Sequence, residues 1–319
     1  MTGYAHGKVI LFGEHAVVHG VPAIAVGIDR GARAVATASG APSTLRVGGW
    51  NVTGTEGESD TPLDRAFNGV LGATRSAGVT IADVHVEAEA DLPPGGGLGC
   101  SAALGVAIAR ALDPSASDGE IATRADAWER VFHGNPSGID AAVSALGGCV
   151  RFQRSDAGPR ISRIVIPAPV HLCIGNSGQI SSTKAMVEAV ARLKDRRPET
   201  TQKAFDAIHT LVKNAELALS DGDNKAVGQL LDLNQMLLSG LFVSTPEIEQ
   251  MCSAARSAGA YGAKLTGGGG GGCVLALVEG PEAAQNVLAA WKKDGFDGFA
   301  TTFGASEPKR ASVVLETSP

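Results

Sequence analysis

The first half of the chain contains a glycine-rich segment, Pro93-Pro94-Gly95-Gly96-Gly97-Leu98-Gly99-Cys100-Ser101-Ala102-Ala103. Before it, Val84 to Ala88 alternates apolar and polar residues as a half-buried strand does. After it, Ser101 to Leu112 is rich in Ala, Leu, Val and Ile without Pro, which favours a helix. Glycines let a backbone approach an anion closely, and the start of a helix adds the positive end of its dipole. The segment therefore predicts a phosphate-binding loop.

Two better-known glycine motifs compete with this interpretation. A P-loop closes with Lys-Ser or Lys-Thr, whereas Cys100-Ser101 closes this loop. A dinucleotide-binding fingerprint read from Gly97 is met only in its relaxed form, and no strand with an acidic residue follows the helix. The second glycine run, Gly267 to Gly272, leads into a strand pattern instead of a helix. These departures disfavour a nicotinamide oxidoreductase, which we keep as the alternative from a different class.

Two further clusters carry charged side chains near turns. An apolar strand at the N-terminus begins with Lys8 and delivers Glu14 and His15 into a turn. Glu129 precedes a Pro/Gly turn, His133 to Asp140, which can fold two carboxylates toward one point. Each feature alone is typical of a solvated strand end or a helix cap. Together with the glycine loop they supply an anion site, a cation and carboxylates, which are the parts that phosphoryl transfer requires.

Composition narrows the class of protein. The chain has 319 residues, of which 44% are hydrophobic, so it is long enough for two domains. A formal net charge of −6 without a block of Lys or Arg argues against nucleic-acid or anionic-membrane partners. Five cysteines without a CxxC spacing predict reduced thiols and no zinc site. Without a secretory signal before Lys8, and without an apolar run near the roughly 20 residues of a membrane span, we expect a cytoplasmic protein.

Strand and helix patterns divide the chain into two halves, which we place at residues 1–155 and 163–319. Each half mixes strands and helices, which predicts an α+β fold. Gln153 to Ser162 is interpreted as a surface connection. The first half is expected to hold strands at Lys8–Phe12, Ala23–Ile28, Ala32–Ala38, Ala82–Ala88 and Cys149–Phe152, and helices at Asp64–Ala77, Ser101–Leu112, Gly119–Val131 and Ser137–Ala145. The second is expected to hold helices at Thr183–Leu193, Thr201–Leu219, Asn224–Leu241 and Pro246–Ala258, and strands around Val165 and at Val170–Cys173, Cys273–Leu277 and Ala311–Leu315.

Three segments are similar to the three signature motifs of the GHMP kinases, in that family's order and spacing: Lys8 to Gly20, Pro93 to Ala103, and Gly262 to Cys273. Within the superfamily the mevalonate kinases match best, on the stretches His133–Asp140, Ser181–Ala185, Asn234-Gln235 and Val243–Pro246. The resemblance spans nearly the whole chain. It implies a two-domain GHMP-kinase fold with the active site between the N-terminal and C-terminal domains. It also implies ATP-dependent phosphorylation of mevalonate to 5-phosphomevalonate, with another GHMP activity such as phosphomevalonate kinase as the alternative.

The resemblance further implies roles for individual residues. Asp140 would orient or deprotonate the acceptor hydroxyl with Lys8 beside it, and Ser101 and Glu129 would hold Mg²⁺. The phosphates of ATP would be bound by Pro94, Gly95, Gly96, Gly97, Leu98, Gly99, Cys100 and Ser101. The acceptor would be bound by Glu14, His15, Thr183 and Gly268. The resemblance is compatible with a homodimer. Cys100 departs from the Ser that is usual in the family, so a hydroxyl is expected only at the next position.

Overall fold

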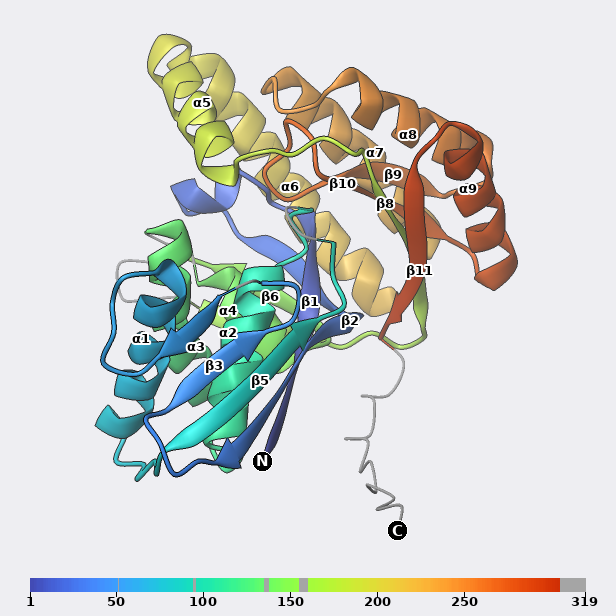
Figure 1. Ribbon diagram of the computed structural model, residues 1–319. Helices are drawn as coiled ribbons and strands as arrows, with labels where there is room; N and C mark the ends of the chain where they lie inside the picture. The colour runs from blue at the N-terminus through green and yellow to red at the C-terminus, as the bar shows by residue number, and fades with distance from the viewer. Residues whose placement is uncertain (51, 94–95, 135–137, 155–159, 305–319) are drawn as a thin grey trace.

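The structure is a computed structural model that describes residues 1–50, 52–93, 96–134, 138–154 and 160–304. It contains two sheets, each with its own set of helices, which meet along the first two strands (Figure 1). This mixture of strands and helices confirms the α+β class. No helix among the described residues is long and apolar enough to cross a bilayer.

The N-terminal sheet has seven strands in the order β4-β3-β5-β2-β6-β7, with β1 paired to β2. All its pairs are antiparallel except β3 with β5. Four helices lie on one side of it, and α2 packs against β1, β2 and β5 (Figure 1). The elements are β1 (Thr2–Phe12), the 3-10 helix η1 (Ala16–His19), β2 (Ala23–Ala38), β3 (Thr44–Val47), β4 (Thr53–Thr55), α1 (Pro62–Ser76), β5 (Val84–Ala90), α2 (Cys100–Leu112), α3 (Asp118–His133), α4 (Ile139–Leu146), β6 (Cys149–Gln153) and β7 (Arg160–Ile164).

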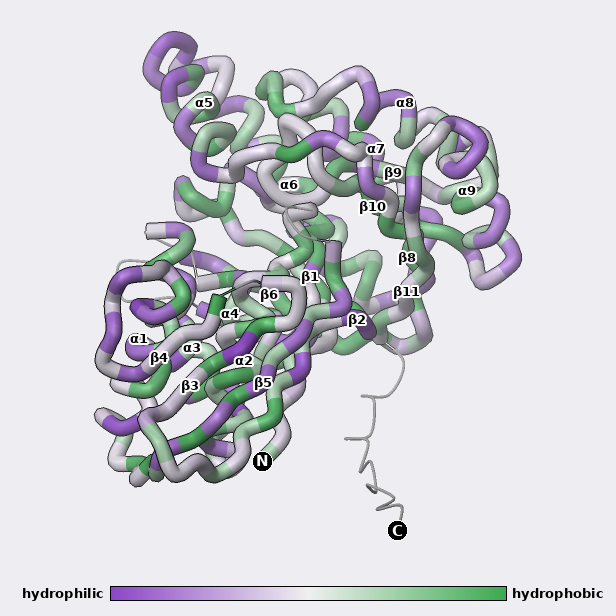
Figure 2. Tube along the Cα trace, viewed as in Figure 1, coloured by the Kyte–Doolittle hydropathy of each residue, from purple (hydrophilic) through white to green (hydrophobic). Residues whose placement is uncertain are grey.

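The C-terminal sheet has four antiparallel strands in the order β11-β8-β10-β9. Hydrophilic residues follow the outer turns of α5, α8 and α9, while the strands between them are largely hydrophobic (Figure 2). The four predicted long helices are confirmed, with ends that differ by three residues at most. The elements are β8 (Val170–Asn176), α5 (Thr183–Arg196), α6 (Pro198–Asp221), α7 (Asn224–Gly240), α8 (Pro246–Ser257), β9 (Gly262–Thr266), β10 (Cys273–Val278), α9 (Pro281–Lys293) and β11 (Asp297–Phe303).

Three expectations about the strands need comment. The two strands predicted at 23–28 and 32–38 form one strand, β2, because Gly31 lets the backbone of β1 pass so closely that a Cβ there would lie 1.9 Å from the Ala5 oxygen. The surface connection predicted through Ser162 is wrong from Arg160 onward, where β7 pairs with β6. This edge strand is almost fully exposed, so its residues resemble a loop. The strand predicted at 311–315 lies outside the described residues.

Candidate active site

The phosphate-binding segment ends where α2 begins. Gly99 is the N-cap of α2, with a left-handed φ of 73° and no side chain to cap the helix. The first amides of a helix lack intrahelical acceptors, so the start of α2 presents N–H donors to an anion. The amide of Lys8 in β1 donates to the Leu98 carbonyl at 2.9 Å, which ties the loop to the N-terminal strand. Pro94 and Gly95, two of the predicted contacts, lie outside the described residues.

Lys8 and Asp140 form an ion pair beside this helix start. Their Nζ and Oδ1 atoms are 3.0 Å apart, and the Lys8 side chain is only 4% exposed. The stem of Lys8 runs past Gly99, where an added Cβ would lie 2.8 Å from Lys8 Cγ. Glycine at this position therefore makes room for the lysine as well as the turn. Asp140 lies in the first turn of α4, which follows Gly138 with a φ of 82°.

Ser101 and Glu129 form the second polar pair. The Ser101 hydroxyl donates to Glu129 Oε1 at 2.6 Å, and the buried Trp128 indole N–H donates to Ser101 Oγ at 3.3 Å. Burial, and after it the negative charge of Asp140, raises the pKa of Glu129 to about 7. The positive charge around Glu129 is thus too small to offset the burial of its carboxylate and the repulsion by Asp140. Electrostatic coupling of Glu129 to both Asp140 and Lys8 shows that the four predicted residues form one cluster.

This cluster suits a Mg²⁺ ion that is shared with phosphate and water better than a metal ion bound by protein ligands alone. Mg²⁺ binds hard oxygens and commonly takes one or two protein ligands, with phosphate and water completing its octahedron. Ser101 and Glu129 offer a hydroxyl and a carboxylate whose charge is unbalanced. Among the described residues, no group of three or more His, Cys, Asp and Glu side chains could hold a metal ion. Cys100 is half-buried, and burial raises the pKa of its thiol, so it remains protonated beside the loop.

Of the predicted acceptor residues, Gly268 contacts both His15 and Thr183. His15 has a left-handed φ of 61°, and its Nε2 is 2.9 Å from the Gly268 carbonyl. A carbonyl only accepts, so Nε2 carries the proton and Nδ1 presents a lone pair. That Nδ1 is buried and has no hydrogen-bond partner among the described residues. Gly268 packs against Thr183, since a Cβ on Gly268 would lie 3.0 Å from Thr183 Cα.

Glu14, the fourth predicted acceptor residue, is paired with a lysine from the other half of the chain. Its Oε1 contacts Lys264 Nζ, and its Oε2 accepts a long bond of 3.5 Å from the Asn234 amide. Both side chains of the ion pair are buried, at 1% and 0% exposure. Burial raises the pKa of Glu14, and the adjacent Lys264 opposes that shift.

Three alternate positions of the third motif contact the first motif. Lys264 pairs with Glu14, Thr266 binds Ile10, and the Gly268 carbonyl accepts from His15. The Thr266 hydroxyl accepts from the Ile10 amide at 2.9 Å and donates to the Ile10 carbonyl at 3.1 Å. Residues two apart share one face of a strand, so one side of β9 and the turn after it holds the two halves of the molecule together.

The sequence did not identify Lys264, Thr266 or Trp128 as site residues. The available signal was Lys264 itself, because a lysine between Ala263 and Leu265 interrupts an otherwise apolar strand and implies a buried counter-charge. Trp128 immediately precedes Glu129, but only the folded helix shows that its indole reaches Ser101.

The neutral state of His15 leads to a testable dependence of stability on pH. Burial lowers the pKa of His15 to about 4, whereas an unfolded histidine titrates near about 6.5. Between these values the unfolded chain binds the extra proton, so stability falls as the pH drops from 6.5 to 4. The loss approaches about 3 kcal/mol. Urea unfolding at pH 7.5 and pH 4 should show this loss in the wild type and a much smaller one in His15→Gln. His209→Gln, on α6, is the control, and an equal loss in all three proteins would contradict the burial argument.

Comparisons with known proteins identify the family to which the chain belongs. The family models for the GHMP kinases N-terminal domain and the GHMP kinases C-terminal region match residues 65–148 and 211–297. A mevalonate kinase from Pyrococcus horikoshii is 36% identical to this chain, and the match covers 91% of this chain and 92% of the relative. A mevalonate kinase from Thermococcus gammatolerans is 34% identical, and the match covers 90% of this chain and 91% of the relative. A crystal structure of L. major mevalonate kinase in complex with R-mevalonate superposes with a TM-score of 0.81 at 27% identity, covering 97% of each chain. The chain therefore belongs to the GHMP kinases and, within them, to the mevalonate kinase family.

Proposed function

We propose that this protein transfers a phosphoryl group from ATP to the primary hydroxyl of mevalonate. The observation that carries the proposal is the pairing of Lys8 with Asp140 beside the uncapped start of α2. It brings a cation and a carboxylate to the place where an anion would bind. The relatives above support the choice of mevalonate as the acceptor. A cytoplasmic location, the lack of a nucleic-acid partner and a homodimer stay predictions from the sequence.

In this proposal Asp140 accepts the proton of the acceptor hydroxyl, and Lys8 stabilises negative charge on the transferring group. A carboxylate is a weak base for an alcohol, but a loose phosphoryl transition state needs little nucleophilic assistance before bond formation. Lys8 is buried and fixed by both Asp140 and the backbone of the loop. Its charge is therefore preorganised, so little reorganisation is needed during the reaction.

The phosphates would be bound mainly by backbone amides. The predicted contacts run from Pro94 to Ser101, and the described part of this segment presents glycines and the start of α2. Ser101 and Glu129 would hold Mg²⁺, which neutralises phosphate charge when bound. Trp128 keeps the Ser101 hydroxyl aligned with Glu129. Cys100 would contribute its backbone amide, because its protonated thiol is a poor ligand for a hard cation.

The acceptor would lie between the first and third motifs. His15 Nδ1 is a buried acceptor without a partner among the described residues, and it suits a substrate hydroxyl. Thr183 adds a hydroxyl at the start of α5, and Gly268 allows close approach. Glu14 is already paired with Lys264, so we assign it an indirect role toward the acceptor. It would fix the position of the neighbouring His15.

Magnesium dependence tests the assignment of Ser101 and Glu129. Ser101→Ala and Glu129→Gln should each raise the magnesium concentration for half-maximal activity by about 10-fold, because each removes an oxygen ligand. Cys100→Ser should leave the magnesium requirement unchanged. Magnesium titrations of initial rates measure the effect. If Cys100→Ser shifts the titration and Ser101→Ala does not, the ligand has been assigned to the wrong residue of the loop.

A substrate panel tests the function as a whole. Purified protein with ATP and magnesium should release ADP far faster with mevalonate than with phosphomevalonate, homoserine or galactose. Faster turnover of phosphomevalonate would favour the alternative GHMP activity, and no ADP release with any of the four would reject the proposal.

A further inference from the structure

The strand of the third motif, β9, is an edge strand whose outward polar groups bind side chains. Among the described residues it has a single strand neighbour, β10. The Ala263 amide donates to Asp232 Oδ1 at 2.9 Å, and the Leu265 amide donates to Gln235 Oε1 at 2.9 Å. The Arg256 guanidinium reaches the Ala263 carbonyl at 3.4 Å. Side chains of α7 and α8 thus occupy the bonding positions of a missing strand, which fixes the register of β9.

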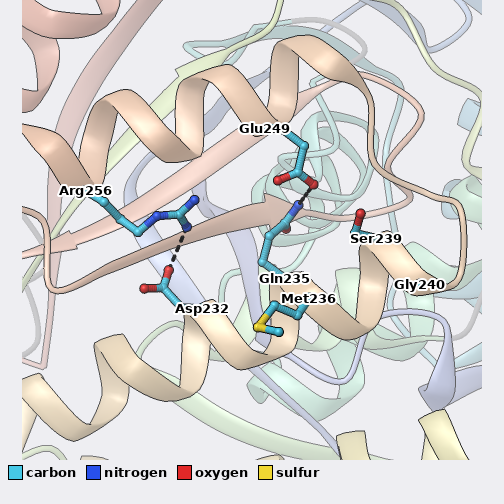
Figure 3. A pocket seen from close by; sticks show the side chains of 7 residues that line it. All are labelled: Asp232, Gln235, Met236, Ser239, Gly240, Glu249 and Arg256. Carbon is cyan, nitrogen blue, oxygen red and sulfur yellow. Dashed lines mark hydrogen bonds and ion pairs between the residues drawn. The ribbon is translucent and has the colours of Figure 1, made fainter.

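Gln235 connects this edge to the segment that binds the middle of the glycine run. Its Nε2 donates to Glu249 Oε1 at 2.9 Å (Figure 3). The same Nε2 donates to Ser244 Oγ at 3.0 Å, and Ser244 donates to Glu249 at 2.6 Å. The residue before Ser244 is Val243, whose carbonyl accepts from the Gly270 amide at 2.7 Å. Bonds from one side chain therefore reach the strand before the glycine run and the segment that holds its middle.

Hydrogen bonds, more than packing, hold Gln235 in place. The side chain is 3% exposed, yet it lies on the wall of an open cavity of about 480 Å³ between α7 and α8 (Figure 3). The cavity is lined by Asp232, Gln235, Met236, Ser239, Gly240, Glu249 and Arg256. An apolar side chain at position 235 would leave the Leu265 amide without its acceptor, and no close-packed neighbour on the cavity side would compensate.

The glycine run contacts both halves of the proposed site. The Gly268 carbonyl accepts from His15 at 2.9 Å. Gly267 packs on the phosphate loop, since a Cβ there would lie 3.5 Å from the Gly97 oxygen. A shift of β9 would therefore displace His15 and the loop together, and misplacement by about 1 Å can cost a reaction 10²-fold.

We propose that Gln235 is a positioning residue for phosphoryl transfer. It fixes the glycine run 267–272 through its bond to the Leu265 amide and through its bonds to Ser244 and Glu249. The inference rests on the proposed kinase function for its readout. Gln235→Leu should lower kcat about 10-fold or more, while KM for ATP and for the acceptor changes less than about 3-fold. Met236→Ala, on the same helix and the same cavity, should keep wild-type kcat because Met236 is exposed.

A reciprocal exchange separates positioning from general loss of structure. Gln235→Glu alone places two carboxylates together and should slow turnover strongly. Glu249→Gln alone removes the negative charge that strengthens these bonds but keeps an acceptor oxygen, so it should slow turnover less. The double variant Gln235→Glu/Glu249→Gln restores one amide donor and one carboxylate acceptor, and the carboxylate at 235 still accepts from Leu265. It should recover kcat to within about 3-fold of the wild type.

Initial rates and thermal unfolding are measured for all five variants with the best acceptor of the substrate panel. Wild-type turnover alone tests the proposed function, whereas ratios among the variants test Gln235. Wild-type kcat in Gln235→Leu would overturn the inference. So would a double variant as slow as its two single variants, or a loss of kcat matched by an equal loss in Met236→Ala.

Discussion

Asp140→Asn is expected to lower kcat by about 10²-fold or more, while ATP binding changes little. The substitution keeps the size of the side chain but removes the carboxylate that we propose as the acceptor of the hydroxyl proton. It also leaves Lys8, at 4% exposure and 3.0 Å from Asp140, without its counter-charge. The loss should therefore appear in turnover, because both groups act in the transition state. Steady-state kinetics with mevalonate and equilibrium titration with ATP measure the two quantities separately.

The control for this variant is Asp206→Asn, an aspartate exposed on α6. It should keep wild-type kinetics. Asp140 lies in the first turn of α4, where its charge also favours the helix by about 0.3–1 kcal/mol. Thermal unfolding of Asp140→Asn should also show a loss of stability, mainly because the buried Lys8 ammonium loses its counter-charge. Turnover within about 3-fold of the wild type would mean that Asp140 serves the helix and not the reaction.

Local patterns predicted most of the elements in this fold. The amphipathic helices from 183 to 258 were recognised because each combines a 3.6-residue apolar period with a clear start, such as Pro198 or Pro246. The start of β7 was interpreted as a surface connection because this strand is an exposed edge, so the strand was expected later, around Val165. Strand β11 was missed because Gly298 and the polar residues around it weaken the alternation that marks a strand. Continuity of β2 depends on how Gly31 packs against β1, which no local pattern contains.

Site residues that lie in local sequence motifs were predictable. Contacts between segments far apart in the sequence were not. Lys8, Ser101, Glu129 and Asp140 stand in or beside recognisable turns, and the structure brings them together. Their partners come from distant segments, and spacing along the sequence carries no information about such contacts. Gln235, for example, lies 30 positions from the Leu265 amide that it binds.

The buried pair of Glu14 and Lys264 should produce the largest effect on stability. Lys264→Met would leave the buried Glu14 carboxylate without its adjacent counter-charge, and the bond from Asn234 is long at 3.5 Å. Breaking a buried ion pair by removing one partner typically costs about 3–5 kcal/mol, because the remaining charge is desolvated without compensation. Urea unfolding at pH 7.5 should show a loss of this size. Glu14→Met should lose a similar amount, since it leaves the ammonium group buried instead.

The double variant Glu14→Met/Lys264→Met tests whether the ion pair serves stability alone or also positions the site. Replacing both charges by apolar groups of similar volume removes the desolvation cost together with the attraction, so stability should return to within about 1–2 kcal/mol of the wild type. Arg130→Met, which breaks the exposed pair with Asp126, is the control and should cost less than about 1 kcal/mol.

Turnover of the double variant then separates two roles of the ion pair. Recovery of stability with low kcat would mean that the pair fixes the turn carrying His15, and recovery of both would mean that it only joins the two halves. Additive losses in the double variant would contradict a direct interaction between Glu14 and Lys264.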